Sequence, residues 1–589
     1  MPRKRGFMRK FVVSSLIALA MVSWSGCKEP DPNAFETHIA SIKDPTGRAN
    51  GLSGLEALVK NITSAPGDHK ERLQEFVDKV LPVFEEVWDQ VTPEQQVIML
   101  NMLTAVGRPE GANLWIKALA LDGSDAARKR VLAALQGVQK ARPPAVVDSV
   151  VALMQGLIKD PSKDKGKTNE GELRLELATT LGELRDKKAT AVLIDAMNQT
   201  KENQPVSVHR EAAKALGMIK DPAAVDALLT VTFRVPDSAS TTDISNRAKL
   251  ALVSIGEPAV PRLKDMLAGK FTEVNELAQK NDVDLLIVQQ TAVGILGAMG
   301  TNAAIDELIA FMPQSDCVPE AAKKPDKKKK KKDEDDEPTE EDAADASLRA
   351  FVGNTLGLIG DPRGVAPLCK CINATHNPGD MFPITEALGR IGGEEAFKCL
   401  AETTKSGEYD PEALDNSDFR YQIRWEAARF AILTANADQL QPLQDALKAA
   451  LTTSEPDKPA SKKIAEEMPK WDAGLKVLES CKADLACYKK TLNDQNADWF
   501  AREKAAFEVT RLAAGDKAAA LEISKAFKVR NPDARVSMAL LVPRVLKGEK
   551  CPECAAALDD VMKGEKGTMD GTLQLSVLTA RAAIARITD

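Results

Sequence analysis

Aromatic side chains are scarce in this sequence. They make up 4% of the 589 residues, with three Tyr in the whole chain, and Ala and Leu carry the 44% hydrophobic content instead. Strands prefer aromatic and β-branched residues, so this composition argues against a β-sandwich or barrel. Because Ala and Leu are inexpensive to order in a helix, the sequence predicts an all-α protein.

Histidine is equally rare. The four residues, His38, His69, His209 and His376, never share an i, i+4 helix face. The sequence also contains no His-Glu-x-x-His motif, no Gly-x-Ser-x-Gly elbow and no Walker phosphate loop. We therefore expect a protein that is not an enzyme and that uses no cofactor.

The first 26 residues have the pattern of a secretory signal peptide. Five basic residues in MPRKRGFMRK precede an apolar run over 11–26. At 16 residues the run is shorter than the roughly 20 that a membrane-spanning helix needs. Removing five positive charges with this leader takes the formal net charge from −7 to −12. So acidic a chain lacks the basic surplus that binding to nucleic acid requires.

The end of the leader, Trp24-Ser25-Gly26-Cys27, resembles the lipobox of bacterial lipoproteins. The usual form is Leu-Ala/Ser-Gly/Ala-Cys, and Trp24 departs from it. The resemblance implies cleavage before Cys27 and lipid attachment to Cys27, which would hold the protein stably on a membrane. Lys28 after the Cys resembles the sorting pattern of outer-membrane lipoproteins, so we expect an outer-membrane anchor facing the periplasm. An ordinary signal cleavage site beside a coincidental Cys is the alternative.

One phrase recurs through the body of the chain. It is EAAKALGMIKDPAAVDALL at 211–229, TAVGILGAMGTNAAIDELI at 291–309 and FVGNTLGLIGDPRGVAPL at 351–368. Each copy has apolar residues at helical spacing, then a turn such as Asp221-Pro222, then a second apolar stripe. Small Ala and Gly residues allow neighbouring helices to approach closely. Such a unit is two antiparallel helices that cannot bury their apolar side alone, so the units stack.

The phrase resembles the HEAT repeat, in the short bacterial form also called PBS-lyase-like HEAT, whose consensus is similar to R-x-x-A-A-x-A-L-G-x-I-G-D-P-x-A-V-x-x-L. The best matches are Arg210–Leu228 and Arg349–Leu368. The resemblance implies an α-solenoid of the HEAT/armadillo type, with roughly ten to twelve helix pairs. It identifies function poorly, since a fold does not fix a function.

The array has predictable boundaries. We expect a signal peptide over 1–26, a lipid-anchored flexible tether over 27–50, and helical repeats over 51–316 and 347–589. Between the repeat blocks, residues 317–346 carry a Lys run followed by DEDDEPTEEDAAD and have no apolar residue able to drive packing. This insert is predicted to be disordered; a docking arm is the alternative.

Eight cysteines remain when Cys27 is set aside, and an even count in an exported protein indicates disulfides. The candidates form two close pairs and a group of four: Cys481 and Cys487, Cys551 and Cys554, and Cys317, Cys369, Cys371 and Cys399. The close pairs suggest local clips, while pairing within the group of four stays open. Thiol redox chemistry or zinc binding at Cys551-Pro-Glu-Cys554 is weighed against a structural bridge. The predicted metal content is none, because no second ligand pair lies near.

The most consistent function is a non-catalytic cell-envelope scaffold that binds another protein along the solenoid surface. Two alternatives stay open. Some relatives of the PBS-lyase-like HEAT type attach a bilin to Cys, which an exported lipoprotein does not favour. A purely structural envelope spacer is the other. The sequence does not assign the partner or the contact residues.

Overall fold

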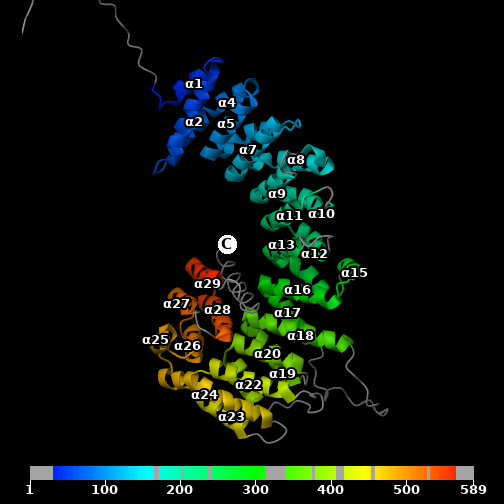
Figure 1. Cartoon of the computed structure of the whole chain (residues 1–589), viewed down its shortest axis with the longest axis vertical. Helices are drawn as coiled ribbons and strands as arrows, with labels where there is room; N and C mark the ends of the chain where they lie inside the picture. The colour runs from blue at the N-terminus through cyan, green and yellow to red at the C-terminus, as the bar shows by residue number, and fades with distance from the viewer. Residues whose placement is uncertain are drawn as a thin grey trace, which may run out of the picture. The chain divides into compact units, whose positions relative to one another are not determined.

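The computed structural model describes residues 31–164, 171–200, 204–234, 242–312, 340–374, 378–405, 417–452, 458–526 and 531–564. Within these ranges every regular element is a helix, and no β-strand occurs. The described chain is an all-α solenoid, as composition and repeat predicted (Figure 1). It forms two compact units, Met1–Val150 and Val151–Asp589, each described by itself.

The first unit begins with four helices outside the repeat pattern. Its helices are α1 (Phe35–Lys43), α2 (Arg48–Ser64), α3 (Lys70–Lys79), α4 (Leu81–Val87), α5 (Pro93–Val106), α6 (Ala112–Ala118) and α7 (Asp125–Ala141), and α8 (Val147–Lys159) begins in it. Helix α5 starts with a capping box. The Thr92 side chain accepts from the Gln95 backbone N–H, and the Gln95 side chain accepts from the Thr92 backbone N–H.

The flexible tether expected over 27–50 is wrong from Phe35 onward. Helix α1 packs against α2, and Phe35 and Ile42, seven residues apart on one face of α1, are fully buried. The Phe35 ring meets Phe76 edge to face, and Phe76 meets Phe84 in the same way. This aromatic cluster supplies the burial that orders α1. Residues up to 30, Cys27 among them, lie outside the described residues.

Within its described residues, the second unit stacks ten antiparallel helix pairs. The first helices of the pairs are α9 (Glu172–Leu184), α11 (Val206–Ile219), α13 (Thr242–Ile255), α16 (Leu285–Met299), α18 (Glu340–Ile359), α20 (Pro378–Ile391), α22 (Ser417–Thr434), α24 (Lys458–Cys481), α26 (Trp499–Leu512) and α28 (Pro532–Leu546). The second helices are α10 (Thr190–Asn198), α12 (Val225–Phe233), α14 (Val260–Leu267), α17 (Asn302–Phe311), α19 (Val365–Ala374), α21 (Glu394–Lys405), α23 (Leu440–Thr452), α25 (Leu485–Asn493), α27 (Lys517–Ala526) and α29 (Pro552–Gly564). An extra helix, α15 (Thr272–Lys280), follows α14.

A short 3-10 turn starts the second half of many repeats. Examples are η3 (Pro144–Val146), η6 (Pro222–Ala224), η8 (Glu257–Ala259) and η10 (Pro362–Gly364). Asp221 caps η6 by accepting from the Ala223 N–H, and Asp361 caps η10 in the same way. The Asp-Pro pair therefore works as the sequence predicted, because proline needs no acceptor at a helix start and aspartate supplies one.

Small residues set the spacing between consecutive first helices, which contact one another throughout the unit. A Cβ added to Gly217 of α11 would lie 2.8 Å from the Cα atom of Ala251 in α13. One added to Gly357 of α18 would lie 2.6 Å from the Cα atom of Ala387 in α20. These distances are too short for any side chain, so glycine is required where the backbones pass.

The insert predicted over 317–346 is too long at its C-terminal end. Helix α18 begins at Glu340, so residues 340–346 (EEDAADA) are helical. Glu and Ala favour helices, and acidic residues in a first turn complement the helix dipole. Residues 313–339, with the Lys run and Cys317, lie outside the described residues.

Candidate functional site

Two cysteines of the group of four join neighbouring repeats. A disulfide links Cys369 of α19 to Cys399 of α21, with Cα atoms 5.9 Å apart and a sequence separation of 30. The sequence left this pairing open. Cys371 is buried and disulfide-bonded as well. A covalent link between adjacent second helices restrains how the two repeats turn relative to each other.

The two close pairs are local bridges. Cys481, the last residue of α24, is bonded to Cys487 in α25, with Cα atoms 5.4 Å apart. Cys551 is bonded to Cys554 at the start of α29, with Cα atoms 5.3 Å apart.

The accessibility of the Cys551–Cys554 bridge bears on redox chemistry. Both residues are fully buried, and the Cys554 N–H donates to the Cys551 sulfur. A reactive dithiol needs sulfur exposed to its substrate, so the geometry favours a structural bridge. In the described ranges, no group of three or more His, Cys, Asp or Glu residues is placed to hold a metal ion.

A basic groove of about 360 Å³ crosses α11 and α13 in the second unit. Its lining residues are Arg185, Lys214, Gly217, Met218, Lys220, Arg247, Leu250, Ala251 and Ser254. Four of these are basic and none is acidic. Arg185 and Lys220 have left-handed backbone conformations directly after α9 and α11, and these positions place both cations at the groove edge.

The charges of the basic groove are mostly unpaired. Lys214 is 2.8 Å from a carboxylate oxygen of Glu211. Within the part of the chain that the structure describes, Arg185, Lys220 and Arg247 make no ion pair. Leu250 is 58% exposed, the largest exposure among the large hydrophobic residues described. An apolar side chain beside unpaired cations is a typical element of a protein-binding surface.

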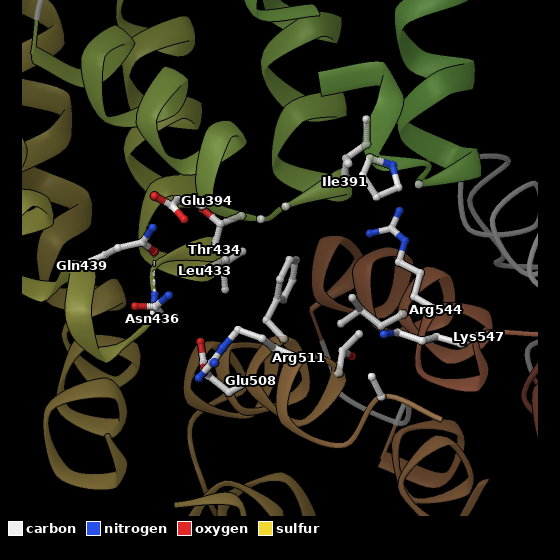
Figure 2. A pocket seen from close by; sticks show the side chains of 18 residues that line it. Ile391, Glu394, Leu433, Thr434, Asn436, Gln439, Glu508, Arg511, Arg544 and Lys547 are labelled. Carbon is white, nitrogen blue, oxygen red and sulfur yellow. Dashed lines mark hydrogen bonds and ion pairs between the residues drawn. The ribbon is translucent and has the colours of Figure 1, made fainter. Parts of the chain in front are cut away.

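A second cavity lies where late repeats return to earlier ones. This C-terminal pocket has a volume of about 540 Å³. Glu508 and Arg511 of α26, Arg544 of α28 and Lys547 directly after α28 form one side, as Figure 2 shows. The ends of α18, α20 and α22 form the other side. The lining residues there are Gly360, Pro362, Ile391, Gly392, Gly393, Glu394, Leu433, Thr434, Asn436 and Gln439.

A buried charge cluster supports the α26 side of the pocket. Lys504 is fully buried, and its ammonium donates to the backbone carbonyls of Leu433 and Ala435 at the end of α22. It also donates to Glu508 at 2.9 Å. Burial lowers the pKa of Lys504, and the Glu508 carboxylate opposes this effect. A cation on the terminal carbonyls of a helix is favourable, so Lys504 holds α26 against α22.

Arg544 makes a similar contact with α18. Its guanidinium Nη2 donates to the Gly357 carbonyl at 2.9 Å, across 187 residues of sequence. Gly360, at φ +75°, leaves room for it, because a Cβ there would lie 2.2 Å from the Arg544 Nε atom. Burial, and secondarily the like charge of Arg390, lower the pKa of Arg544 to about 9. The guanidinium therefore stays protonated at neutral pH.

Neither surface was identified from the sequence. Lys504 and Glu508 did leave a signal: when Arg502 is aligned with Arg210, Lys504 stands where the repeat has Ala212 and Glu508 stands where it has Leu216. Arg544 left none, because its acceptor lies in a distant repeat. Cys27 and Cys317 lie outside the described residues. No described helix is long and apolar enough to cross a bilayer.

Comparison with known proteins identifies the repeat. A family model described as HEAT repeats matches residues 150–239, from α8 through α12. Among curated proteins no sequence matches this chain. Similar solved structures include human deoxyhypusine hydroxylase in complex with glycerol, at 17% identity and a TM-score of 0.19, covering 55% of this chain and 96% of that one.

Two further similar structures are larger solenoids. Importin beta is 12% identical with a TM-score of 0.29, covering 94% of this chain and 74% of its own. Kap121p is 11% identical with a TM-score of 0.21, covering 94% and 75%. TM-scores this low support no conclusion about what this chain does.

Proposed function

We propose that this protein is a non-catalytic scaffold whose basic groove binds an acidic segment of a partner protein. The observation that carries the proposal is four basic and no acidic lining residues in a chain of net charge −7. Local charge opposite to the net charge marks a surface that attracts an oppositely charged partner. Leu250, an exposed residue of the groove lining, offers an apolar contact to that segment.

The proposal also covers where in the cell the scaffold is located. Residues 1–27 carry the signal-peptide and lipobox patterns, and we propose that lipid on Cys27 anchors the protein in the cell envelope, on the periplasmic side of an outer membrane. Cys27→Ser should release the protein from membranes and change the mature mass. A variant that fractionates and weighs the same as the wild type, apart from the substitution, would refute the anchor.

Site-specific crosslinking tests the groove in the full chain. A photoreactive amino acid at Leu250 should yield one crosslinked partner, and mass spectrometry should place the crosslink in an acidic segment. The matched control is the same label at Leu451, which is 40% exposed on α23. Charge reversal by Arg247→Glu should abolish the Leu250 crosslink.

The alternatives give different results in the same experiment. A structural spacer would give no specific product at Leu250. A bilin lyase would instead release or transfer a chromophore, visible by absorbance, and would not depend on Arg247. A crosslink that persists in Arg247→Glu, or that maps to a basic or neutral segment, contradicts the proposed groove.

A further inference from the structure

We propose that the C-terminal pocket binds a carboxylate attached to an apolar body. Arg544 and Lys547 hold the carboxylate, and the apolar wall around Phe507 contacts the body. This site is separate from the basic groove on α11 and α13, and its test does not depend on the proposed function.

The first argument is that the acids of the pocket are already occupied. One oxygen of Glu508 accepts from Lys504 at 2.9 Å, and the other accepts from Arg511 at 2.7 Å. Glu394 faces the pocket from the start of α21, but its partner is Lys398, at 3.0 Å. Glu508 is therefore not available to Arg544 or Lys547, and within the described residues Glu394 forms no ion pair with either of them.

The second argument is that Arg544 lacks a counterion. Within the described residues its one hydrogen bond goes to the Gly357 carbonyl, and its Nε atom is buried without a partner. The charged neighbour that acts on its pKa is Arg390, whose guanidinium lies 3.3 Å from a carboxylate oxygen of Glu386. A part-buried cation without an anion is unfavourable, and a bound anion removes that cost.

The third argument is the backbone opposite Arg544. Helix α21 begins at Glu394, directly after the lining residues Gly392 and Gly393, so the positive end of its dipole lies at the pocket wall. Gly392 and Gly393 have positive φ angles, 70° and 94°, which favour glycine. Because glycine has no side chain, the backbone of this turn is open to the pocket. The turn adds to the attraction for an anion that Arg544 and Lys547 provide.

The remaining walls favour an apolar ligand body. Leucine, isoleucine and phenylalanine side chains line the pocket from both sides: Ile391, Leu433, Phe507 and Leu541. A volume of about 540 Å³ falls within the usual range of small-ligand pockets. Such pockets are usually lined by apolar side chains with a few polar groups among them. A small inorganic anion would leave these walls in contact with water. A carboxylate with an aliphatic tail would pair with the cations and also cover the apolar walls.

The alternative is that Arg544 only caps the C-terminal end of α18, and this alternative makes a different prediction. A cap needs no ligand, so no carboxylate would bind. The probes are octanoate, for a free carboxylic acid, and acetyl-Ala-Leu-Leu with a free C-terminus, for a peptide carboxylate. Octanol and the peptide amide are the neutral controls. Isothermal titration of the full chain measures each affinity.

We expect octanoate or the peptide acid to bind and its neutral control to bind at least about tenfold more weakly. The tighter of the two acids identifies the natural source of the carboxylate. Arg544→Gln should weaken binding by about tenfold or more, and Lys547→Gln by about threefold. The control, Lys517→Gln, changes an exposed lysine outside the pocket and should leave the affinity unchanged.

Lys547 is exposed, so Lys547→Gln keeps the test valid if Arg544→Gln fails to fold. The proposal is overturned if neither acid binds up to its solubility limit. It is also overturned if octanol binds as well as octanoate, if Lys547→Gln binds like the wild type, or if inorganic phosphate displaces octanoate at equal concentration. The last result would indicate an unspecific anion site.

Discussion

Replacing one glycine at a time tests whether close helix approach holds the solenoid together. Gly217 of α11 and Gly294 of α16 are both helical. Alanine is more favourable than glycine in a helix interior by about 0.5–1 kcal/mol. At Gly294 a Cβ would meet nothing within 4 Å. We therefore expect Gly294→Ala to increase the free energy of unfolding by about that amount.

At Gly217 the same gain meets a larger cost. The new Cβ would lie 2.8 Å from Ala251 Cα and 3.0 Å from Ala251 Cβ, whereas carbon atoms pack favourably at about 3.5–4.0 Å. The obstacle is partly backbone, so no rotamer change relieves it and α11 must move away from α13. Overpacking costs about 1–3 kcal/mol. After the helix gain of about 0.5–1 kcal/mol, Gly217→Ala should destabilise by up to about 2.5 kcal/mol.

Urea unfolding of the full chain, followed by far-ultraviolet circular dichroism, measures the sign of each change. A long repeat array need not unfold in one step, so hydrogen exchange of α11 and α13 peptides localises the effect. Gly217→Ala should lower the midpoint and reduce protection in those peptides. If it raised the midpoint as Gly294→Ala does, close approach would not be the reason for glycine at this position.

Three further changes follow from particular contacts. Lys504→Met removes a buried cation from Glu508 and from two carbonyls, so it should destabilise the C-terminal repeats by about 3–5 kcal/mol, seen as lost hydrogen-exchange protection at the end of α22. Burial lowers the pKa of His209, so the unfolded chain binds the proton more readily than the folded chain does. The free energy of unfolding should therefore fall as the pH drops below about 6.5. His209→Gln should flatten this part of a plot of urea midpoint against pH. Denatured, unreduced protein should show Cys371 in a disulfide-linked peptide, and a mass spectrum with Cys371 alkylated before reduction would contradict this bond.

Much of the repeat architecture was predictable from the sequence, because each helix pair is a local pattern. The pattern of a single repeat was enough to predict the Asp221-Pro222 turn and the small residue at Gly217. Helix α1 was missed, because two apolar residues in a polar stretch gain their burial from α2 and from Phe76, which lie later in the chain. The insert boundary was missed because EEDAADA is both acidic and helix-favouring.

The C-terminal pocket depends on curvature, and no local motif encodes curvature. A small rotation at each repeat accumulates until α28 reaches α18. Nothing near Arg544 in the sequence indicates that its acceptor is Gly357, 187 residues away. Such a contact is visible only when the repeats are stacked in three dimensions.

The two long-range contacts of the pocket share one physical principle. Lys504 and Arg544 each donate to backbone carbonyls at the end of an earlier helix, α22 and α18 respectively. Those helix ends carry partial negative charge, so a cation from a later repeat fixes the curvature there. The pocket exists only while these contacts hold, since α26 and α28 form one of its sides. A ligand that binds the pocket must therefore stabilise the curved arrangement by the same free energy with which the curvature favours the ligand.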